Sequence, residues 1–279
     1  MDKNDEYCAA LVREADRDRY LATLFAPADR RGALFSLYAF DIEISRIREL
    51  AREPMPGEIR LQWWREVLEG ERAGEAAANP VAVSLLATLA RYRLTSQKLV
   101  DLVEAHRFDV YDEPMPTLSS LETYASNTAG TIFDCAARIL DESAEVKAIA
   151  WKAGQARTLA SVIASLPRCA ARRQLYVPLD MLRQYGASPD DMFAMHASPE
   201  LRKVIAGLRL RARAHLARIA ELSIPEKIGP AFLSLAPLRT WLNKMEGAKY
   251  RPFHPLELPA WRRQWRIWRA AKSLDRIGR

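Results

Sequence analysis

Cysteine is scarce in this sequence, and no long apolar run occurs in it. The three cysteines (Cys8, Cys135 and Cys169) are an odd number without a paired motif, which argues against a disulfide framework and a structural zinc site and favours a reducing compartment. No apolar run approaches the roughly 18 to 20 residues that span a bilayer, and the polar start MDKNDEY is unlike a signal peptide. We therefore expect a cytoplasmic protein with neither a signal peptide nor a transmembrane helix.

Glycine is also scarce, with 11 in 279 residues, and β-branched residues seldom cluster, whereas Ala, Leu, Arg and Glu are abundant. This composition favours helices over strands. The 49% of hydrophobic residues is enough for a substantial core. Because no internal repeat, low-complexity tract or long linker interrupts the chain, we predict an all-α protein with a single domain over residues 1–279.

Positive charge gathers towards the C-terminus. Residues 200–279 hold 18 Lys/Arg against 6 Asp/Glu, a net charge of +12, whereas the preceding residues carry −5 of the total of +7. A basic surface of this kind suits an anionic membrane, an acidic partner, a diphosphate or nucleic acid. No helix-turn-helix, finger or RNA-binding signature is present, so we do not expect nucleic acid as a partner.

Apolar periodicity and helix-ending residues predict the helices. Their approximate ranges are 5–25, 28–49, 59–70, 81–92, 96–111, 118–140, 143–166, 199–222, 224–246 and 259–277. Thr95 and Thr117 stand at N-cap positions. In the helix over 118–140, small residues surround Gly130, whose cost within a helix suggests that another helix or a ligand approaches closely there.

Residues 154–178 have the layout of an active-site helix but lack its acids. Ser161, Ser165 and Cys169 follow at four-residue spacing and would share one face of an unbroken helix, although Pro167 interrupts the pattern. Asp41, Ser45 and Glu49 make a comparable stripe in the helix over 28–49.

Three segments together resemble the squalene/phytoene synthase family: RDRYLATLFAPADRRGALFSLYAFDIEISRI, residues 124–131 and residues 154–178. The resemblance covers most of residues 10–185 and implies an isoprenoid-synthase fold, a helical bundle around a central cavity. In active members, two aspartate-rich motifs hold Mg²⁺, which binds the diphosphate of a prenyl substrate before head-to-head condensation.

Both motifs are degenerate here. The first falls on residues 45–49, where Ser45 replaces the leading acid and Glu49 remains; the second falls on residues 165–169, where Ser165 and Cys169 replace both acids. Ionisation of a diphosphate depends on carboxylate-held Mg²⁺ as a Lewis acid, so we expect no catalytic residues, no metal and no cofactor. A rearranged Mg²⁺ site is the alternative, and its candidate acids are Asp41, Glu43, Asp109, Asp112 and Asp134. Four of these acids also have a plainer interpretation: ion pairs with nearby arginines such as Arg46 and Arg48 for Asp41 and Glu43, and a solvated helix end for Asp109 and Asp112.

The resemblance also implies a retained pocket for an isoprenoid or another lipid. Its predicted residues are Tyr38, Asp41, Tyr124, Gly130, Thr131, Arg157, Ser161, Arg173 and Tyr176. We expect Arg157, Arg172 and Arg173 to meet an anionic head group. Helix packing and a rigid turn are the alternative role for the small and aromatic members of this set. The four histidines form no metal-binding pair, and we expect structural or surface roles for them.

Several segments, among them AFDIEISRIRE and LPRCAARRQLYVPLDMLRQYGAS, look most like the branch of this family related to the mitochondrial complex I assembly factor. That branch implies a degenerate, non-catalytic assembly or lipid-binding factor. Its partners would be subunits or assembly intermediates of respiratory complex I, at the inner face of the membrane. The alternatives are an active Mg²⁺-dependent prenyl transferase, and a structural or interaction protein with a collapsed cavity.

The predicted helix over 259–277 combines tryptophan and arginine. Trp261, Trp265 and Trp268 form a narrow stripe, with arginines beside it. Two interpretations remain open from the sequence: the indoles dock against the bundle, or the helix lies on an anionic membrane.

Overall fold

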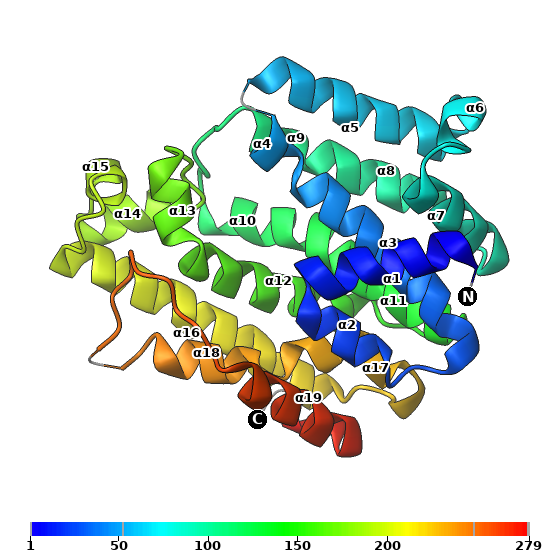
Figure 1. Ribbon diagram of the computed structural model, residues 1–279. Helices are drawn as coiled ribbons and strands as arrows, with labels where there is room; N and C mark the ends of the chain where they lie inside the picture. The colour runs from blue at the N-terminus through cyan, green and yellow to red at the C-terminus, as the bar shows by residue number, and fades with distance from the viewer. Residues whose placement is uncertain (1, 52, 248, 278–279) are drawn as a thin grey trace.

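The computed structural model describes residues 2–51, 53–247 and 249–277, and helices without strands make up the regular structure of these ranges (Figure 1). The longer helices are α1 (Lys3–Ala15), α3 (Ala28–Ser45), α5 (Pro54–Glu69), α7 (Pro80–Arg91), α8 (Ser96–Ala105), α10 (Leu118–Ala125), α11 (Thr131–Leu140), α12 (Lys147–Ala164), α16 (Pro199–Leu222) and α19 (Ala260–Lys272). Shorter helices include α2 (Arg17–Thr23), α4 (Ile47–Leu50), α9 (Arg107–Val110), α13 (Leu166–Ala171) and α14 (Leu179–Tyr185). The all-α prediction is therefore confirmed.

Two helices, α3 and α12, lie at the centre of the bundle. α3 packs between α1, α7 and α11, and nearly every side chain from Gly32 to Phe40 is buried. α12 packs along α16 on one side and on α10 and α11 on the other. Because both helices are apolar around most of their circumference, they can be covered on all sides by amphipathic neighbours. None of the described helices is long and apolar enough to cross a membrane.

The close approach predicted at Gly130 is present. Ser126–Gly130 forms a single π-helical turn (η1) between α10 and α11. A Cβ atom on Gly154 of α12 would lie 2.3 Å from the backbone nitrogen of Gly130 and 2.7 Å from the carbonyl oxygen of Ala125. Backbone therefore meets backbone at this crossing, and the predicted helix over 118–140 is interrupted to make the contact.

Several predicted helices are shorter than the sequence suggested. The range 5–25 divides at Asp16, whose side chain caps α2 by accepting a hydrogen bond from the backbone N–H of Arg19 at 3.1 Å. Thr117 caps α10 in the same way, but Thr95 makes no such bond. The single helix predicted over 224–246 is wrong. Pro225, Pro230 and Pro237 lack the N–H that a continuous helix needs, and they stand where that range divides into short α- and 3₁₀-helices.

Candidate functional site

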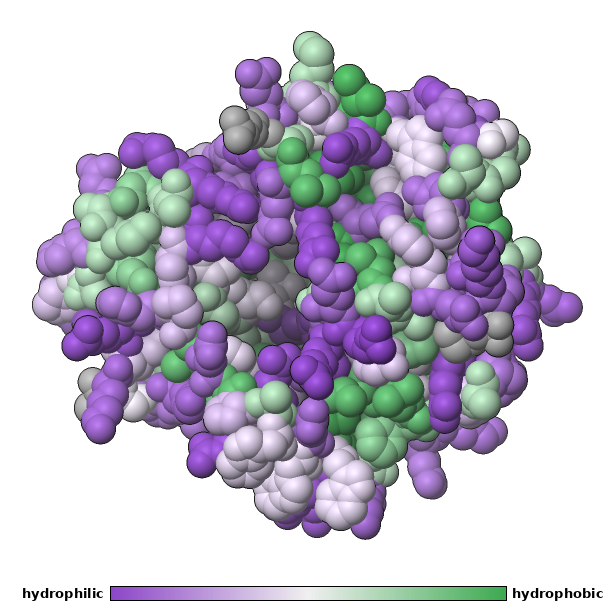
Figure 2. All heavy atoms as spheres, viewed as in Figure 1, coloured by the Kyte–Doolittle hydropathy of each residue, from purple (hydrophilic) through white to green (hydrophobic). Residues whose placement is uncertain are grey.

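A cavity of about 470 Å³ opens where α2, α3, α12 and α13 meet. In Figure 2 a hollow near the middle of the molecule lies over this region. The residues that line it are Ala15, Asp16, Arg19, Asp41, Ile42, Ser45, Arg46, Arg48, Glu49, His106, Asp109, Tyr124, Thr128, Ala129, Arg157, Thr158, Ser161, Val162, Ser165, Arg168, Cys169, Arg172, Gln174 and Tyr176. Its volume is in the range of small-molecule binding sites.

The four degenerate motif positions all line this cavity. Ser45 ends α3, and its Oγ donates a hydrogen bond to the carbonyl oxygen of Ile42 at 3.2 Å. Ser165 lies in the break between α12 and α13, one turn before Cys169, whose Sγ donates to its Oγ at 3.4 Å. Burial raises the pKa of the Cys169 thiol, so the thiol stays neutral and is a poor metal ligand near neutral pH. Ser161 lines the same wall, so the predicted common face survives the break.

Glu49, the acid that remains in the first motif, is paired with arginines of the second. Its Oε1 lies 2.7 Å from Arg168 and 3.5 Å from Arg172. The two motifs therefore face each other across the cavity mouth, as the family arrangement implies. Here they are joined by ion pairs between protein side chains.

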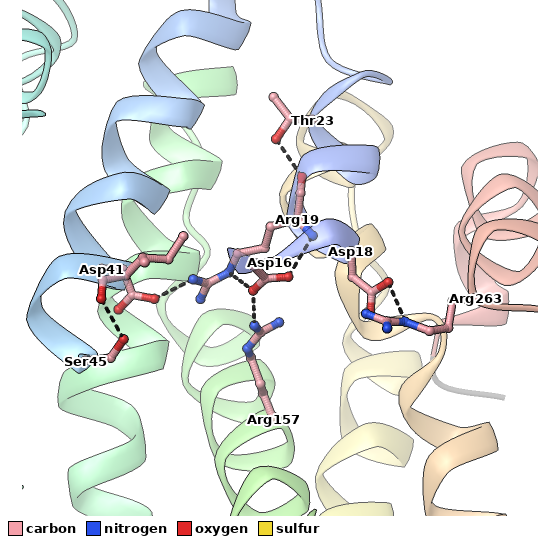
Figure 3. A network of polar contacts seen from close by, with 9 residues as sticks. Asp16, Asp18, Arg19, Thr23, Asp41, Ser45, Arg157 and Arg263 are labelled. Atoms are coloured by element: carbon pink, nitrogen blue, oxygen red, sulfur yellow. Dashed lines mark hydrogen bonds and ion pairs between the residues drawn. The ribbon is translucent and has the colours of Figure 1, made fainter. Parts of the chain in front are cut away.

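The acids on the opposite wall are also paired with arginines (Figure 3). Arg19, which is 4% exposed, donates to Asp41 and forms an ion pair with Asp16 at 3.6 Å. Arg157 of α12 donates to the same Asp16 carboxylate at 2.5 Å. Burial alone would lower the pKa of Arg19, but the carboxylates of Asp41 and Asp16 outweigh it and raise that pKa above its ordinary value. Burial opposes ionisation of Asp16, yet Arg157 and Arg19 lower its pKa overall. Both carboxylates of this network are therefore paired with guanidinium groups of the protein.

A third polar group lies around Asp109. Its carboxylate accepts hydrogen bonds from the hydroxyls of Tyr124 at 2.9 Å and Tyr176 at 2.7 Å, and from Nδ1 of His106 at 2.6 Å. Burial and the Asp109 charge raise the pKa of both tyrosines well above 10. Burial disfavours the charged imidazole of His106, but its bond to Asp109 raises the pKa overall. The solvated helix end predicted for Asp109 is wrong, because the residue is 9% exposed.

The family's Mg²⁺ cluster does not fit these side chains. Asp41 and Asp16 are paired with the guanidinium groups of Arg19 and Arg157, and Glu49 is paired with two more. Asp112 is held by Arg48, and Asp134 by Lys98 and Arg138. Within the described ranges, no group of three or more His, Cys, Asp or Glu residues is placed to hold a metal ion. A rearranged carboxylate cluster is therefore not built by these acids.

Four predicted cavity residues lie elsewhere. Tyr38 is buried beneath Arg19, whose guanidinium lies 5.0 Å from the ring centre, so it supports the wall from behind. Gly130 is at the helix crossing, and the hydroxyl of Thr131 donates to the carbonyl oxygen of Asn127. Arg173 has a left-handed backbone (φ 56°) and does not line the cavity; its guanidinium stacks on Phe193. Asp41, Tyr124, Arg157, Ser161 and Tyr176 do line the cavity.

Sequence reasoning missed Arg19, Asp16 and His106 as members of the site. The sequence predicted Asp16 and Arg19 to lie within one amphipathic helix. An aspartate three residues before Arg19 is, however, the spacing of an N-cap and the residue that it caps, and this signal indicates a helix start at Asp16. For His106 the sequence predicted a structural or surface role. Its partner Asp109 lies three residues further on, a spacing that brings side chains together on a helix.

The tryptophans of α19 are exposed rather than docked. Trp261, Trp265 and Trp268 are 62%, 46% and 47% exposed, whereas Ile267 and Ala270 of the same helix are buried. Arg263 ties the helix to α2 by donating to Asp18 at 2.9 Å (Figure 3). The interpretation in which the indoles dock against the bundle is therefore wrong.

The bundle with its two facing motifs defines an isoprenoid-synthase type of fold. The protein belongs to the squalene/phytoene synthase family, because the family model matches residues 12–269, well beyond the 10–185 that the motifs suggested. A dehydrosqualene synthase shares the fold with a TM-score of 0.81 at 16% identity, covering 98% of this chain and 96% of its own. A squalene synthase from Alicyclobacillus acidocaldarius shares it with a TM-score of 0.74 at 23% identity, covering 91% and 95%.

Curated relatives fall into two groups. The NADH dehydrogenase (ubiquinone) complex I, assembly factor 6 of Homo sapiens is 28% identical over 90% of this chain and 76% of its own length. The 15-cis-phytoene synthase of Synechococcus elongatus is 26% identical over 92% and 89%. The curated relatives that match this chain thus include both assembly factors and synthases.

Proposed function

We propose that this chain is a non-catalytic member of the family that serves the assembly of respiratory complex I. The observation that carries the proposal is the state of the two motifs. Ser45, Ser165 and Cys169 stand where acids would hold Mg²⁺, and Glu49 is bound by arginines of the opposite motif. Without carboxylates free to bind a metal, the cavity cannot stabilise a departing diphosphate through Mg²⁺, as active members do.

Similarity to complex I assembly factor 6 supports the cellular role. The similarity to the human protein extends over most of both chains. It is accompanied by a cavity in which arginines pair with Asp16, Asp41 and Glu49. An active prenyl transferase remains the alternative outcome of the tests, and no contact in the cavity favours it.

The cavity and α19 give this role two points of contact with lipid. The cavity would hold an isoprenoid or another lipid, because the apolar side chains of Ile42, Val162 and Ala129 line it together with the arginines. The exposed indoles of α19, with arginines and a lysine beside them, suit the interfacial region of an anionic membrane. The protein would then act at the inner face of the membrane in which complex I is assembled.

Deletion of the gene in the organism that carries it tests the proposal. We expect the NADH dehydrogenase activity of isolated membranes to fall and a plasmid copy of the wild-type gene to restore it. Succinate dehydrogenase activity in the same membranes is the control and should be unchanged. Normal NADH dehydrogenase activity in the deletion strain would contradict the assembly role.

A further inference from the structure

Both degenerate motifs contain arginine, at Arg46 and Arg48 in the first and at Arg168 in the second. Six arginines line the cavity (Arg19, Arg46, Arg48, Arg157, Arg168 and Arg172), against four acids. A cavity that held its ligand through Mg²⁺ would need the opposite balance, since carboxylates must first attract the metal. The excess of arginines over acids in this cavity therefore favours direct binding of an anion, without a bridging cation.

We propose that the cavity binds the phosphate group of an amphiphile directly through Arg46, Arg168 and Arg172, without a metal ion. This inference rests on the proposed function only in requiring that the cavity holds a lipid. Guanidinium groups recognise phosphate through paired, charge-assisted hydrogen bonds and remain charged at every physiological pH. They supply in the protein itself the positive charge that a metal would otherwise bring.

Ion pairing and solvent exposure distinguish these three arginines from the others that line the cavity. Arg19 is bound to Asp41 and Arg157 to Asp16, and breaking the pair of Arg19 would leave an uncompensated buried charge. Arg48 is held by Asp112. Arg168 and Arg172 are 59% and 36% exposed, so their pairing with Glu49 is worth little and exchanges readily for a more strongly charged partner.

Arg46 strengthens the assignment. It follows Ser45 at the end of α3, lines the cavity and forms no ion pair with any residue that the structure describes. Glu49 thus pairs with two of the three arginines, whose combined charge it offsets only in part, and leaves the third available. A phosphate group carrying up to two charges would replace Glu49 as the partner of Arg168 and Arg172 and would also engage Arg46.

The interior of the cavity is suited to the rest of an amphiphile. Ile42, Val162 and Ala129 line it, and its volume of about 470 Å³ exceeds what a free phosphate needs. His106 also lines it, and its buried Nε2 has no hydrogen-bond partner in the described structure. A buried nitrogen without a partner is costly, so Nε2 favours a ligand with a polar atom inside the cavity.

Binding measured by calorimetry on the full chain tests the inference. The probes are farnesyl diphosphate, farnesol and inorganic diphosphate, each with EDTA and with Mg²⁺. We expect farnesyl diphosphate to bind in EDTA, with no gain from Mg²⁺, and to bind at least about tenfold more tightly than either other probe, since it combines charged hydrogen bonds with burial of an apolar chain. Farnesol binding equally well would overturn the phosphate assignment while leaving a lipid-binding cavity intact. Inorganic diphosphate binding equally well, or binding that requires Mg²⁺, would also overturn it.

Variants locate the site. Arg168→Gln combined with Arg172→Gln should weaken farnesyl diphosphate binding by about tenfold or more. Arg183→Gln, which removes an exposed arginine of α14 outside the cavity, should not weaken it. Glu49→Gln should tighten binding severalfold, because it removes the competing carboxylate. A double variant that binds as wild type, or a Glu49→Gln variant that binds more weakly while folded by circular dichroism, would contradict the assignment.

Discussion

In this cavity Arg19 provides positive charge that a metal ion would otherwise bring to the carboxylates. Its buried guanidinium lies between the carboxylates of Asp16 and Asp41, stacks on Tyr38 and is fixed by the turn that Asp16 caps. The carboxylates are thereby neutralised without a metal. Since breaking a buried pair of this kind costs about 3–5 kcal/mol, the acids are not readily released to bind one.

Gly154 is the residue on which the crossing of α12 and the π-helical turn depends. Gly154→Ala should lower the free energy of unfolding by about 1–3 kcal/mol, because the added methyl group meets backbone atoms at 2.3 to 2.7 Å that cannot move aside. Gly74→Ala is the matched control, since nothing lies within 4 Å of its Cβ and alanine favours a helix. Urea unfolding measures both. Equal stability of Gly154→Ala and wild type would contradict the close crossing.

At the scale of the element, α19 presents a polar aromatic surface to solvent. Lys272 lies 3.9 Å from the ring of Trp268, and Arg269 lies 4.5 Å from that of Trp265. In Figure 2 pale side chains of intermediate hydropathy gather at the lower edge, where Figure 1 places α19. Because Ile267 and Ala270 anchor the helix, deleting it would disturb the bundle, whereas substituting its exposed indoles would not.

Replacing Trp261, Trp265 and Trp268 by alanine should reduce pelleting with vesicles that contain phosphatidylglycerol, because the indoles supply the interfacial contact. Thermal stability should change little, since surface substitutions usually alter the free energy of unfolding by about 0.5 kcal/mol or less. The matched control replaces Leu50, Met55 and Ile59, three apolar residues that are at least as exposed and lie at the opposite end of the molecule, by alanine. Equal pelleting of the tryptophan variant and wild type would exclude the membrane role of α19.

At the scale of the whole molecule, the sequence predicted the all-α class, the family and the place of both motifs, because periodicity and short motifs are local signals. It did not predict the arginine pairing of Asp16 and Asp41, which joins α2, α3 and α12. Nor did it decide which side of α19 is buried, since a stripe of three tryptophans fits a core and a membrane equally well. Arg173 was misplaced because its left-handed backbone is not a property of its local sequence.

The measurement that tests the central claim most directly is release of diphosphate from farnesyl and geranylgeranyl diphosphate by the purified protein with Mg²⁺. A dehydrosqualene synthase assayed in parallel shows that substrate and metal are competent. We predict no release above the rate without protein, because the side chains that would hold the metal are serine, cysteine and acids paired with arginines. Release at a rate comparable to that of the synthase would contradict the account.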